Sequence, residues 1–540
     1  ARRSTTLLAA IIASCAMVLS LTACTSDNKT VVDGQTTVTS NSAGGVAVFT
    51  PSDGITLNQQ TPLNKWAKLV PDLAKALADA GFKKGDIDHT TSDSLAKQSR
   101  AIQDFVVDHL SNNTTDDSGI AIAPDNMTLL VAPVVEADAS TRQYGDYIGQ
   151  NLSTNDATDG EATSDGESSE DDSSKDDSSN TESDSTASDE QAQAVDRLVS
   201  SLKLAKESGM HVVLLGNSIE GYKPDAFVKF SDAQTIGKLQ AEKMVSKLKL
   251  DKASKDNPKY IEVLLPYTAV DEKGNANDST FAQEAFRGIW QVLGSYYQKG
   301  VVESPSGTLD GKSTENDWQA VAYDAAKEGS TAKVLDKRLA KTDGQSTLTR
   351  IDGIITMNDY IASEVVKELD DLGYTGSAGD INPQITISGI VGNITGKKDL
   401  SRDAVPDPIK SPENDNANDS SSSDDDADED TSASDKDRDS QWPLVTGYGA
   451  YVSNIPSIVN GKQWMTGMED RQTIATDIAQ ACAKLNKDEA LNSMPSIRNS
   501  EVGGVKKIPT ISEPLLAVSA SNLKSALIDP GYISLADAGL

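Results

Sequence analysis

The sequence predicts an α/β protein built from two doubly wound lobes, each with a parallel sheet. Segments such as "MHVVLLGN" at 210–217 are nearly continuous apolar runs, which is typical of parallel strands covered on both faces. Segments with an apolar residue every three or four positions, such as 194–209, alternate with these runs. The alternation occurs in two successive rounds, so we expect one lobe for each round.

The first round begins with an apolar run after a polar stretch. Its predicted elements are strand 44–51, helix 63–81, helix 94–110, strand 119–126, helix 194–209, and strands 210–217 and 226–232. The helix 63–81 stops at Gly81, as glycine commonly ends a helix.

The second round follows directly. Its predicted elements are helix 233–249, strand 260–267, helix 281–297, helix 318–328, strand 352–357, helix 360–372, and strands 384–390 and 443–449. Ligands of doubly wound sheets bind at the carboxyl ends of the strands. Asn358 and Asp359 follow the strand 352–357 and therefore occupy a suitable place.

Two acidic runs carry most of the charge. Residues 153–190 hold 14 acids and one lysine, and residues 411–440 hold 12 acids, one lysine and one arginine, out of a formal net charge of −33. Neither run has enough apolar side chains to offset chain entropy, so we expect both to be disordered inserts. Calcium binding is the alternative, although the spaced carboxylates of an EF-hand loop are missing. The negative charge argues against a nucleic-acid partner.

The first 24 residues predict export. Arg2 and Arg3 precede an apolar stretch at 7–21, which is shorter than the roughly 20 residues that span a bilayer. "LTAC" at 21–24 is similar to the lipobox of bacterial lipoproteins, in which the cysteine is lipidated; an ordinary secretory signal is the alternative. We expect Cys24 to anchor the protein to the outer face of the bacterial cytoplasmic membrane. Cys482 lies in a helical pattern, so we expect a buried free thiol.

The sequence contains little that predicts catalysis. The three histidines are scattered without metal-ligand spacing, and no nucleophile elbow occurs. "GTLDGKS" at 307–313 is one residue short of a P-loop, and "GYGAYV" at 447–452 has only two of the three glycines of a dinucleotide fingerprint. We therefore expect a protein that is not an enzyme and that uses no cofactor or metal.

Four segments, taken in order, resemble one protein family. They are "FVKFSDAQTIGKLQAEKMV" at 227–245, "DGIITMNDYIASEVVKEL" at 352–369, "VTGYGAYVSNIPSIVNGKQWMT" at 445–466 and "KIPTISEPLLAVSASNLKSALIDPGYIS" at 507–534. With the lipobox, they resemble the type I periplasmic-type substrate-binding proteins of ABC sugar transporters, nearest the xylose-binding branch. The resemblance covers residues from about 44 to 540, without the acidic inserts. Repressors of the same fold would carry an N-terminal helix-turn-helix, where this chain has a signal peptide.

The resemblance implies two lobes joined by three hinge crossovers, near 230–233, 464–468 and 514–516. The expected division of the chain is a signal peptide at 1–23, a tether at 24–43, lobe one at 44–231, lobe two at 232–465, a return to lobe one at 466–514, and a C-terminal segment at 515–540 that crosses to lobe two.

The resemblance also implies a set of ligand-binding residues at strand ends. These are Trp66, Asp125, Asn126, Asn217, Asn358, Asp359, Tyr448 and Tyr451, with Trp318 and Trp464 as less well placed ring surfaces. We expect Asn358 to cap its helix and Asp359 to face the cleft. Which of two late strand ends, 387–389 or 445–447, lines the cleft stays open.

The chain departs from the family pattern at three places. Gly216-Asn217 replaces a common Asp-Arg pair, Gly449 stands where an acid is common, and Ala282 stands near a usual asparagine. Either the ligand differs from a common pentose or the alignment shifts in these loops.

The resemblance implies capture of a small polar ligand, a sugar, by a monomer that delivers it to the permease of an ABC importer. Two alternatives remain open at this stage. One is a receptor of the same fold that signals to a membrane partner, and the other is a surface protein that has lost its ligand cleft.

Overall fold

The computed structural model describes residues 29–32, 35–38, 42–52, 62–112, 122–136, 138, 140–154, 181–271, 273–378 and 441–539. The chain divides into two compact units, Ala1–Ser42 and Ala43–Leu540. Several predicted features lie outside the described residues. They are the signal peptide, Cys24, the strand at 384–390, most of the acidic run 153–190 and all of the acidic run 411–440. No helix among the described residues is long and apolar enough to cross a membrane.

The first unit contains a short hairpin within the predicted polar tether. Strand β1 (Lys29–Val32) pairs in antiparallel fashion with β2 (Gln35–Val38). Threonine and valine dominate both strands, and β-branched residues favour extended backbone.

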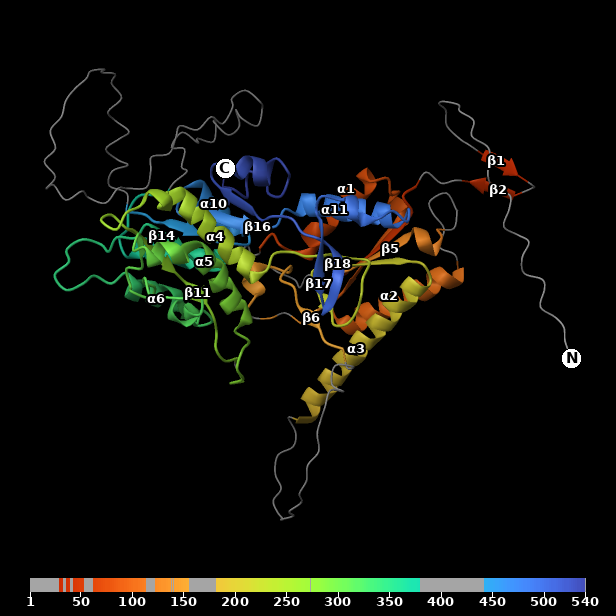
Figure 1. Ribbon diagram of the computed structural model, residues 1–540, viewed down its shortest axis with the longest axis horizontal. Coiled ribbons are helices and arrows are strands. Elements are labelled where there is room, and N and C mark those ends of the chain that lie inside the picture. The colour runs from red at the N-terminus through yellow and green to blue at the C-terminus, as the bar shows by residue number, and fades with distance from the viewer. Residues whose placement is uncertain are drawn as a thin grey trace, which may run out of the picture. The chain divides into compact units, whose positions relative to one another are not determined.

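Lobe one of the second unit is organised around a seven-stranded sheet (Figure 1). In spatial order the strands are β17 (Ile497–Val502), β18 (Val505–Ile511), β9 (Ala226–Val228), β7 (His211–Leu215), β5 (Met127–Val131), β3 (Gly45–Pro51) and β4 (Ile87–Ser92). All neighbours are parallel except β17 and β18 at one edge. The order confirms the predicted doubly wound sheet.

Helices cover both faces of this sheet (Figure 1). On one face α1 (Trp66–Asp79) and α11 (Arg471–Leu485) share a core with the sheet, and Cys482 is buried there as a free thiol, as predicted. On the other face lie α2 (Leu95–Asn112) and α3 (Thr181–Glu207). Because both faces are covered, the central strands are apolar on both sides, which is the pattern seen in the sequence.

Lobe two contains a second parallel sheet of four strands. In spatial order they are β12 (Val302–Glu303), β10 (Lys259–Val263), β14 (Gly353–Ile355) and β15 (Leu444–Thr446), with the short parallel pair β11 (Leu265–Pro266) and β13 (Ala322–Tyr323) beside them. Its helices are α4 (Ala233–Leu248), α5 (Thr280–Gln298), α6 (Ser330–Arg338), α7 (Asp359–Asp371) and α10 (Ile455–Val459). The strand order repeats that of lobe one, so the two lobes share a topology.

Three connections join the lobes. The chain passes from β9 to α4, from β16 (Met465–Met468) to α11, and from β18 to β19 (Leu516–Ser519). Strands β16 and β19 pair with each other, and the C-terminal π-helical turn η9 (Lys524–Ile528) packs beside them. The fold is therefore the predicted two-lobed α/β fold with three crossovers.

Short elements complete the fold. They are β6 (Asn151–Leu152), its partner β8 (Ser218–Ile219), and the 3₁₀ turns η1 (Lys84–Asp86), η2 (Pro124–Asn126), η3 (Arg142–Tyr144), η5 (Leu250–Lys252), η6 (Asp317–Ala320), η7 (Val452–Asn454) and η8 (Leu491–Ser493).

Helices α4 and α5 approach each other through two glycines. A Cβ atom at Gly237 would collide with the carbonyl oxygen of Ala285, and one at Gly288 would collide with the carbonyl oxygen of Gln234. Because these neighbours are backbone atoms, a side chain at either position has no room unless the helices separate.

Gly288→Ala should therefore lower the free energy of unfolding by about 3 kcal/mol, the upper part of the range for overpacking a core. Ser295→Ala on the exposed face of α5 is the control and should change stability by less than about 0.5 kcal/mol. Urea denaturation of both variants measures the difference. Equal urea midpoints for Gly288→Ala and Ser295→Ala would mean that α4 and α5 tolerate a wider separation than this structure shows.

Three predicted elements are wrong. The first is the strand predicted at 119–126. Of its described residues, 124–126 form the turn η2, and the strand is the next segment, "MTLLV" at 127–131. The helix at 318–328 is replaced by η6 and β13, because Val321 and Tyr323 are buried beside β11. Helix α3 begins at Thr181, so the last ten residues of the predicted insert, 181–190, are helical.

Candidate functional site

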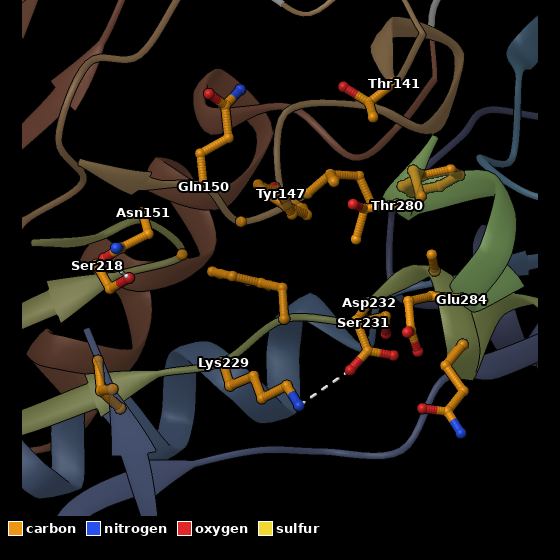
Figure 2. Close-up of a pocket in the computed structure, with 18 of the residues that line it drawn as sticks. Thr141, Tyr147, Gln150, Asn151, Ser218, Lys229, Ser231, Asp232, Thr280 and Glu284 are labelled. Carbon is orange, nitrogen blue, oxygen red and sulfur yellow. Dashed lines mark hydrogen bonds and ion pairs between the residues drawn. The ribbon is translucent and has the colours of Figure 1, made fainter. Parts of the chain in front are cut away.

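A cavity of about 650 Å³ lies between the two lobes (Figure 2). Lobe one contributes strand ends and loops, and lobe two contributes the amino ends of α4 and α5. The lining residues that offer polar side chains are Asp138, Thr141, Gln150, Asn151, Ser218, Lys229, Ser231, Asp232, Gln234, Asp278, Thr280, Glu284, Ser500 and Glu501. A cavity of this size can enclose a small molecule.

The lobe-one wall is formed where parallel strands end. Gly216 and Ser218 follow β7, and Lys229 follows β9, which places them at the carboxyl edge of the sheet. The hydroxyl of Ser218 donates to the side-chain oxygen of Asn151 at 2.9 Å, which links β8 to β6. Lys229 forms an ion pair with Asp232 at 3.0 Å across the crossover into lobe two (Figure 2).

The lobe-two wall is formed by two capped helix ends. Asp232 accepts from the backbone amide of Thr235 at 2.8 Å and caps α4. Asp278 accepts from the amide of Thr280 at 3.0 Å at the start of α5. The close contact of α4 with α5 sets these ends side by side, so that Thr280 and Glu284 face the cavity from successive turns of α5 (Figure 2).

An aromatic cluster forms the floor of the cavity. The rings of Tyr147 and Phe230 stack with centroids 4.5 Å apart, and Trp66 meets both edge-on at 5.1 and 5.7 Å. Tyr147 and Phe230 line the cavity, whereas Trp66 lies behind them. Tyr147 and Phe230 are only 2% and 5% exposed, so this floor offers the cavity a small apolar surface.

The cavity lining is strongly acidic. It holds five carboxylates against one lysine, Lys229. Carboxylates accept hydrogen bonds and cannot donate them, so the wall favours a neutral or cationic ligand that is rich in donors. Among the described residues no cluster of three or more histidine, cysteine or acidic side chains could hold a metal ion.

A second polar cluster lies at the crossovers. Glu469, between β16 and α11, is 1% exposed, and its Oε1 accepts from the amide of Ser231 at 2.7 Å and from the hydroxyl of Tyr448 at 3.4 Å. Its Oε2 has no hydrogen-bond partner, and neither has Nδ2 of the fully buried Asn64. Burial raises the pKa of Glu469 from 4.5 to about 7.

Asn358 caps α7, as predicted. Its side-chain oxygen accepts from the amide of Ile361 at 2.9 Å. Asp359 does not face the cavity, because its carboxylate is fully buried and bonded within lobe two. It accepts from the amide of Tyr451 at 2.9 Å, from Nε2 of Gln463 at 2.8 Å and from the hydroxyl of Thr466 at 2.9 Å. Burial raises its pKa to about 6.

The other predicted residues near the strand ends are also buried. Asn217 donates to the carbonyl of Pro133 and accepts from the amide of Gln150, both at 2.9 Å. The Tyr451 hydroxyl donates to the carbonyl of Gln143 at 2.7 Å. The structure thus brings Trp66 and Asn217 to one side of residues 141–150, and Asn358, Tyr448 and Tyr451 to the other.

Asp125 and Asn126 lie at the wrong edge for this site. They belong to η2, which precedes β5, so they stand at the amino end of the strand and not at its carboxyl end. The carbonyl of Asp125 contacts Nε2 of His211 at the start of β7. Trp318 packs against Tyr267 at 5.1 Å, and Trp464 is 7% exposed; neither lines the cavity.

Sequence reasoning missed the residues that line the cavity. Tyr147 and Gln150 lie in the loop 141–150, whose polar composition resembles an ordinary surface connection. Gln234 lies in the first turn of α4 and Glu284 in the second turn of α5. The helical pattern was visible there, but the orientation toward the other lobe was not. Glu469 of the crossover cluster was also missed, although it lies three residues after the segment 445–466.

A scan against models of protein families found no match, and a search of curated proteins also found none. Among solved structures the chain is similar to an ABC transporter solute-binding protein from Clostridium phytofermentans with bound β-D-glucose. That comparison has 16% identity and a TM-score of 0.43, and it covers 91% of this chain and 99% of the other. A carbohydrate transporter solute-binding protein from Chloroflexus aurantiacus, in complex with D-glucose, has 18% identity and a TM-score of 0.42, covering 92% and 98%. Because the sequence identities and TM-scores are low, these similarities do not indicate what this chain binds.

Proposed function

We propose that this protein binds a small, hydroxyl-rich solute of the sugar class in the interlobe cavity. The observation that carries this proposal is the lining itself: carboxylates, amides and hydroxyls on both walls above a floor of stacked aromatic rings. Sugar hydroxyls donate to carboxylates and accept from amides and hydroxyls. The role is binding and not catalysis.

Particular side chains are placed to recognise neighbouring hydroxyls. Thr280 and Glu284 lie one helical turn apart on α5 and offer a hydroxyl and a carboxylate from lobe two. Gln150 and Ser218 offer an amide and a hydroxyl from lobe one (Figure 2). A solute that bonds both walls favours the closed arrangement by its differential affinity.

We propose further that the bound solute is delivered to the permease of an ABC importer at the membrane surface. The sequence supports this step through the lipobox-like residues 21–24, which would attach the protein by a lipid on Cys24 to the outer face of the membrane. The membrane-anchored protein can then pass its solute to a transporter in the same membrane.

A thermal-shift screen of monosaccharides tests the proposal, with Glu284→Gln as the diagnostic variant. A sugar at 100 times its dissociation constant should add about 2.7 kcal/mol to the free energy of unfolding. Loss of a charge-assisted hydrogen bond costs about 1.5–3 kcal/mol, so Glu284→Gln should weaken affinity by about 10-fold or more.

The matched control is Glu242→Gln, a half-exposed glutamate on α4 that pairs with Lys238 and does not line the cavity. Its affinity for the same sugar should equal that of the wild type. If Glu284→Gln and Glu242→Gln bind equally well, the sugar occupies another site.

A further inference from the structure

Residues 141–150, which we name the bridging segment, contact both lobes. The segment follows β5 of lobe one and leads into β6. Tyr144 belongs to the hydrophobic core of lobe two, whereas Tyr147, three residues later, belongs to the core of lobe one. Both rings are almost fully buried, at 1% and 2% exposure. One short loop therefore places an aromatic anchor in each lobe.

The contacts with lobe one are concentrated at the start of α1. The Asp146 carboxylate forms an ion pair with Lys65 at 3.0 Å and accepts from the amide of Trp66 at 3.2 Å. The residue before α1 provides no side-chain cap, so Asp146 supplies this function from the bridging segment. The Tyr147 hydroxyl donates to the carbonyl of Lys65 at 2.6 Å.

The contacts with lobe two are concentrated at the carboxyl ends of β14 and β15. The centroid of the Tyr144 ring lies 4.6 Å from that of Phe281 and 6.2 Å from that of Tyr448. The Tyr451 hydroxyl donates to the carbonyl of Gln143 at 2.7 Å. Carboxyl ends of parallel strands are the usual ligand-binding edge of a doubly wound sheet.

We propose that the bridging segment acts as a built-in ligand, which holds the two lobes closed when no solute is bound. A ligand closes a two-lobed protein by binding the closed form better than the open one. This segment does so with two buried rings, an ion pair and several hydrogen bonds, and its covalent attachment gives it a high effective concentration. Opening the lobes requires the segment to leave at least one of them.

Gly145 provides a way to detach the segment without removing either anchor. Its φ angle is 95°, in the region that favours glycine, and a Cβ atom would lie 2.5 Å from the carbonyl oxygen of Asn64 in lobe one. Gly145→Ala should push the segment off the start of α1. The control is Gly221→Ala, which also has a positive φ, 69°, but has open space around its Cβ position.

The test measures the distance between the lobes by double electron–electron resonance, with no solute present. Spin labels are attached at Lys75→Cys on lobe one and Lys327→Cys on lobe two, where the side chains are 78% and 81% exposed. Cys482 is fully buried and does not react with the label. Cys15 and Cys24 are replaced in every labelled protein.

The parent protein and Gly221→Ala should each give one narrow distance distribution. Gly145→Ala should give a broader distribution that shifts to longer distances while the circular dichroism spectrum stays unchanged. Tyr144→Ala, which removes the lobe-two anchor, should shift the distribution in the same direction. Tyr296→Ala, a tyrosine of α5 that bonds Asp251 away from the segment, should not.

An unchanged narrow distribution in both Gly145→Ala and Tyr144→Ala would overturn the proposal, because the lobes would then be held by the crossovers alone. A parent protein that already shows a broad distribution would overturn it as well. No sugar is used, so these outcomes are independent of whether the cavity binds one. If Gly145→Ala fails to fold, Tyr144→Ala decides the result.

Discussion

Asp359→Ala should lower the free energy of unfolding by about 3–5 kcal/mol, because three buried donors lose their acceptor and each unsatisfied donor costs about 1–3 kcal/mol. The amide of Tyr451, the amide group of Gln463 and the hydroxyl of Thr466 would lose their common acceptor. This result differs from the sequence-based expectation that Asp359 faces the cleft.

Asp371→Ala, at the exposed end of the same helix, is the matched control and should change stability by less than about 0.5 kcal/mol. Asp359→Asn should lie between the two, because an amide keeps one acceptor oxygen but points a donor at other donors. Urea denaturation measures all three. A fully stable Asp359→Ala would contradict the network seen here and restore a ligand role for this carboxylate.

Glu469→Gln should remove part of the pH dependence of stability. The pKa of Glu469 is about 7 in the folded protein and 4.5 in a free side chain. Between pH 4.5 and 7 the folded protein therefore holds a proton that the unfolded chain has released. Raising the pH through this window lowers the free energy of unfolding. The stabilisation is fully present below pH 4.5 and is lost as the pH rises through about 7.

The shift corresponds to about 3 kcal/mol, at about 1.4 kcal/mol for each pKa unit. The free energy of unfolding of Glu469→Gln should therefore change less between pH 4.5 and 7 than that of the wild type. At pH 8 the variant should be at least as stable as the wild type. The raised pKa of Asp359, about 6, acts in the same direction but is common to both proteins. Glu242→Gln serves as the control. Parallel stability curves for wild type and Glu469→Gln would show that Glu469 is ionised in the folded state across this range.

The sequence predicted the fold well wherever a local pattern decided the structure. The apolar run 210–217 became β7, and the stripe at 360–372 became α7, which is one residue earlier at each end. The strand predicted at 119–126 is wrong because Ile120 and Ile122 alternate like strand residues. The strand is the neighbouring "MTLLV", every residue of which is buried between the helices on the two faces of the sheet.

The site was predicted less well, because its contacts join distant parts of the chain. Asn358 follows β14 at the carboxyl edge of the lobe-two sheet and caps α7, as predicted. The same edge is covered by Tyr144, which the sequence separates from Tyr448 by about 300 residues. No periodicity in residues 141–150 indicates that two tyrosines enter opposite lobes. Long-range packing of this kind leaves no local signal in one sequence.

The central claim is that the interlobe cavity binds a sugar, and isothermal titration calorimetry of the whole protein tests it most directly. A panel of aldohexoses, aldopentoses and polyols is titrated into the wild type and into Glu284→Gln. We predict saturable binding of at least one sugar to a single site of the wild type, and an affinity lower by about 10-fold or more in the variant. Absence of heat from every sugar at millimolar concentration, or equal affinity in the two proteins, would contradict the claim.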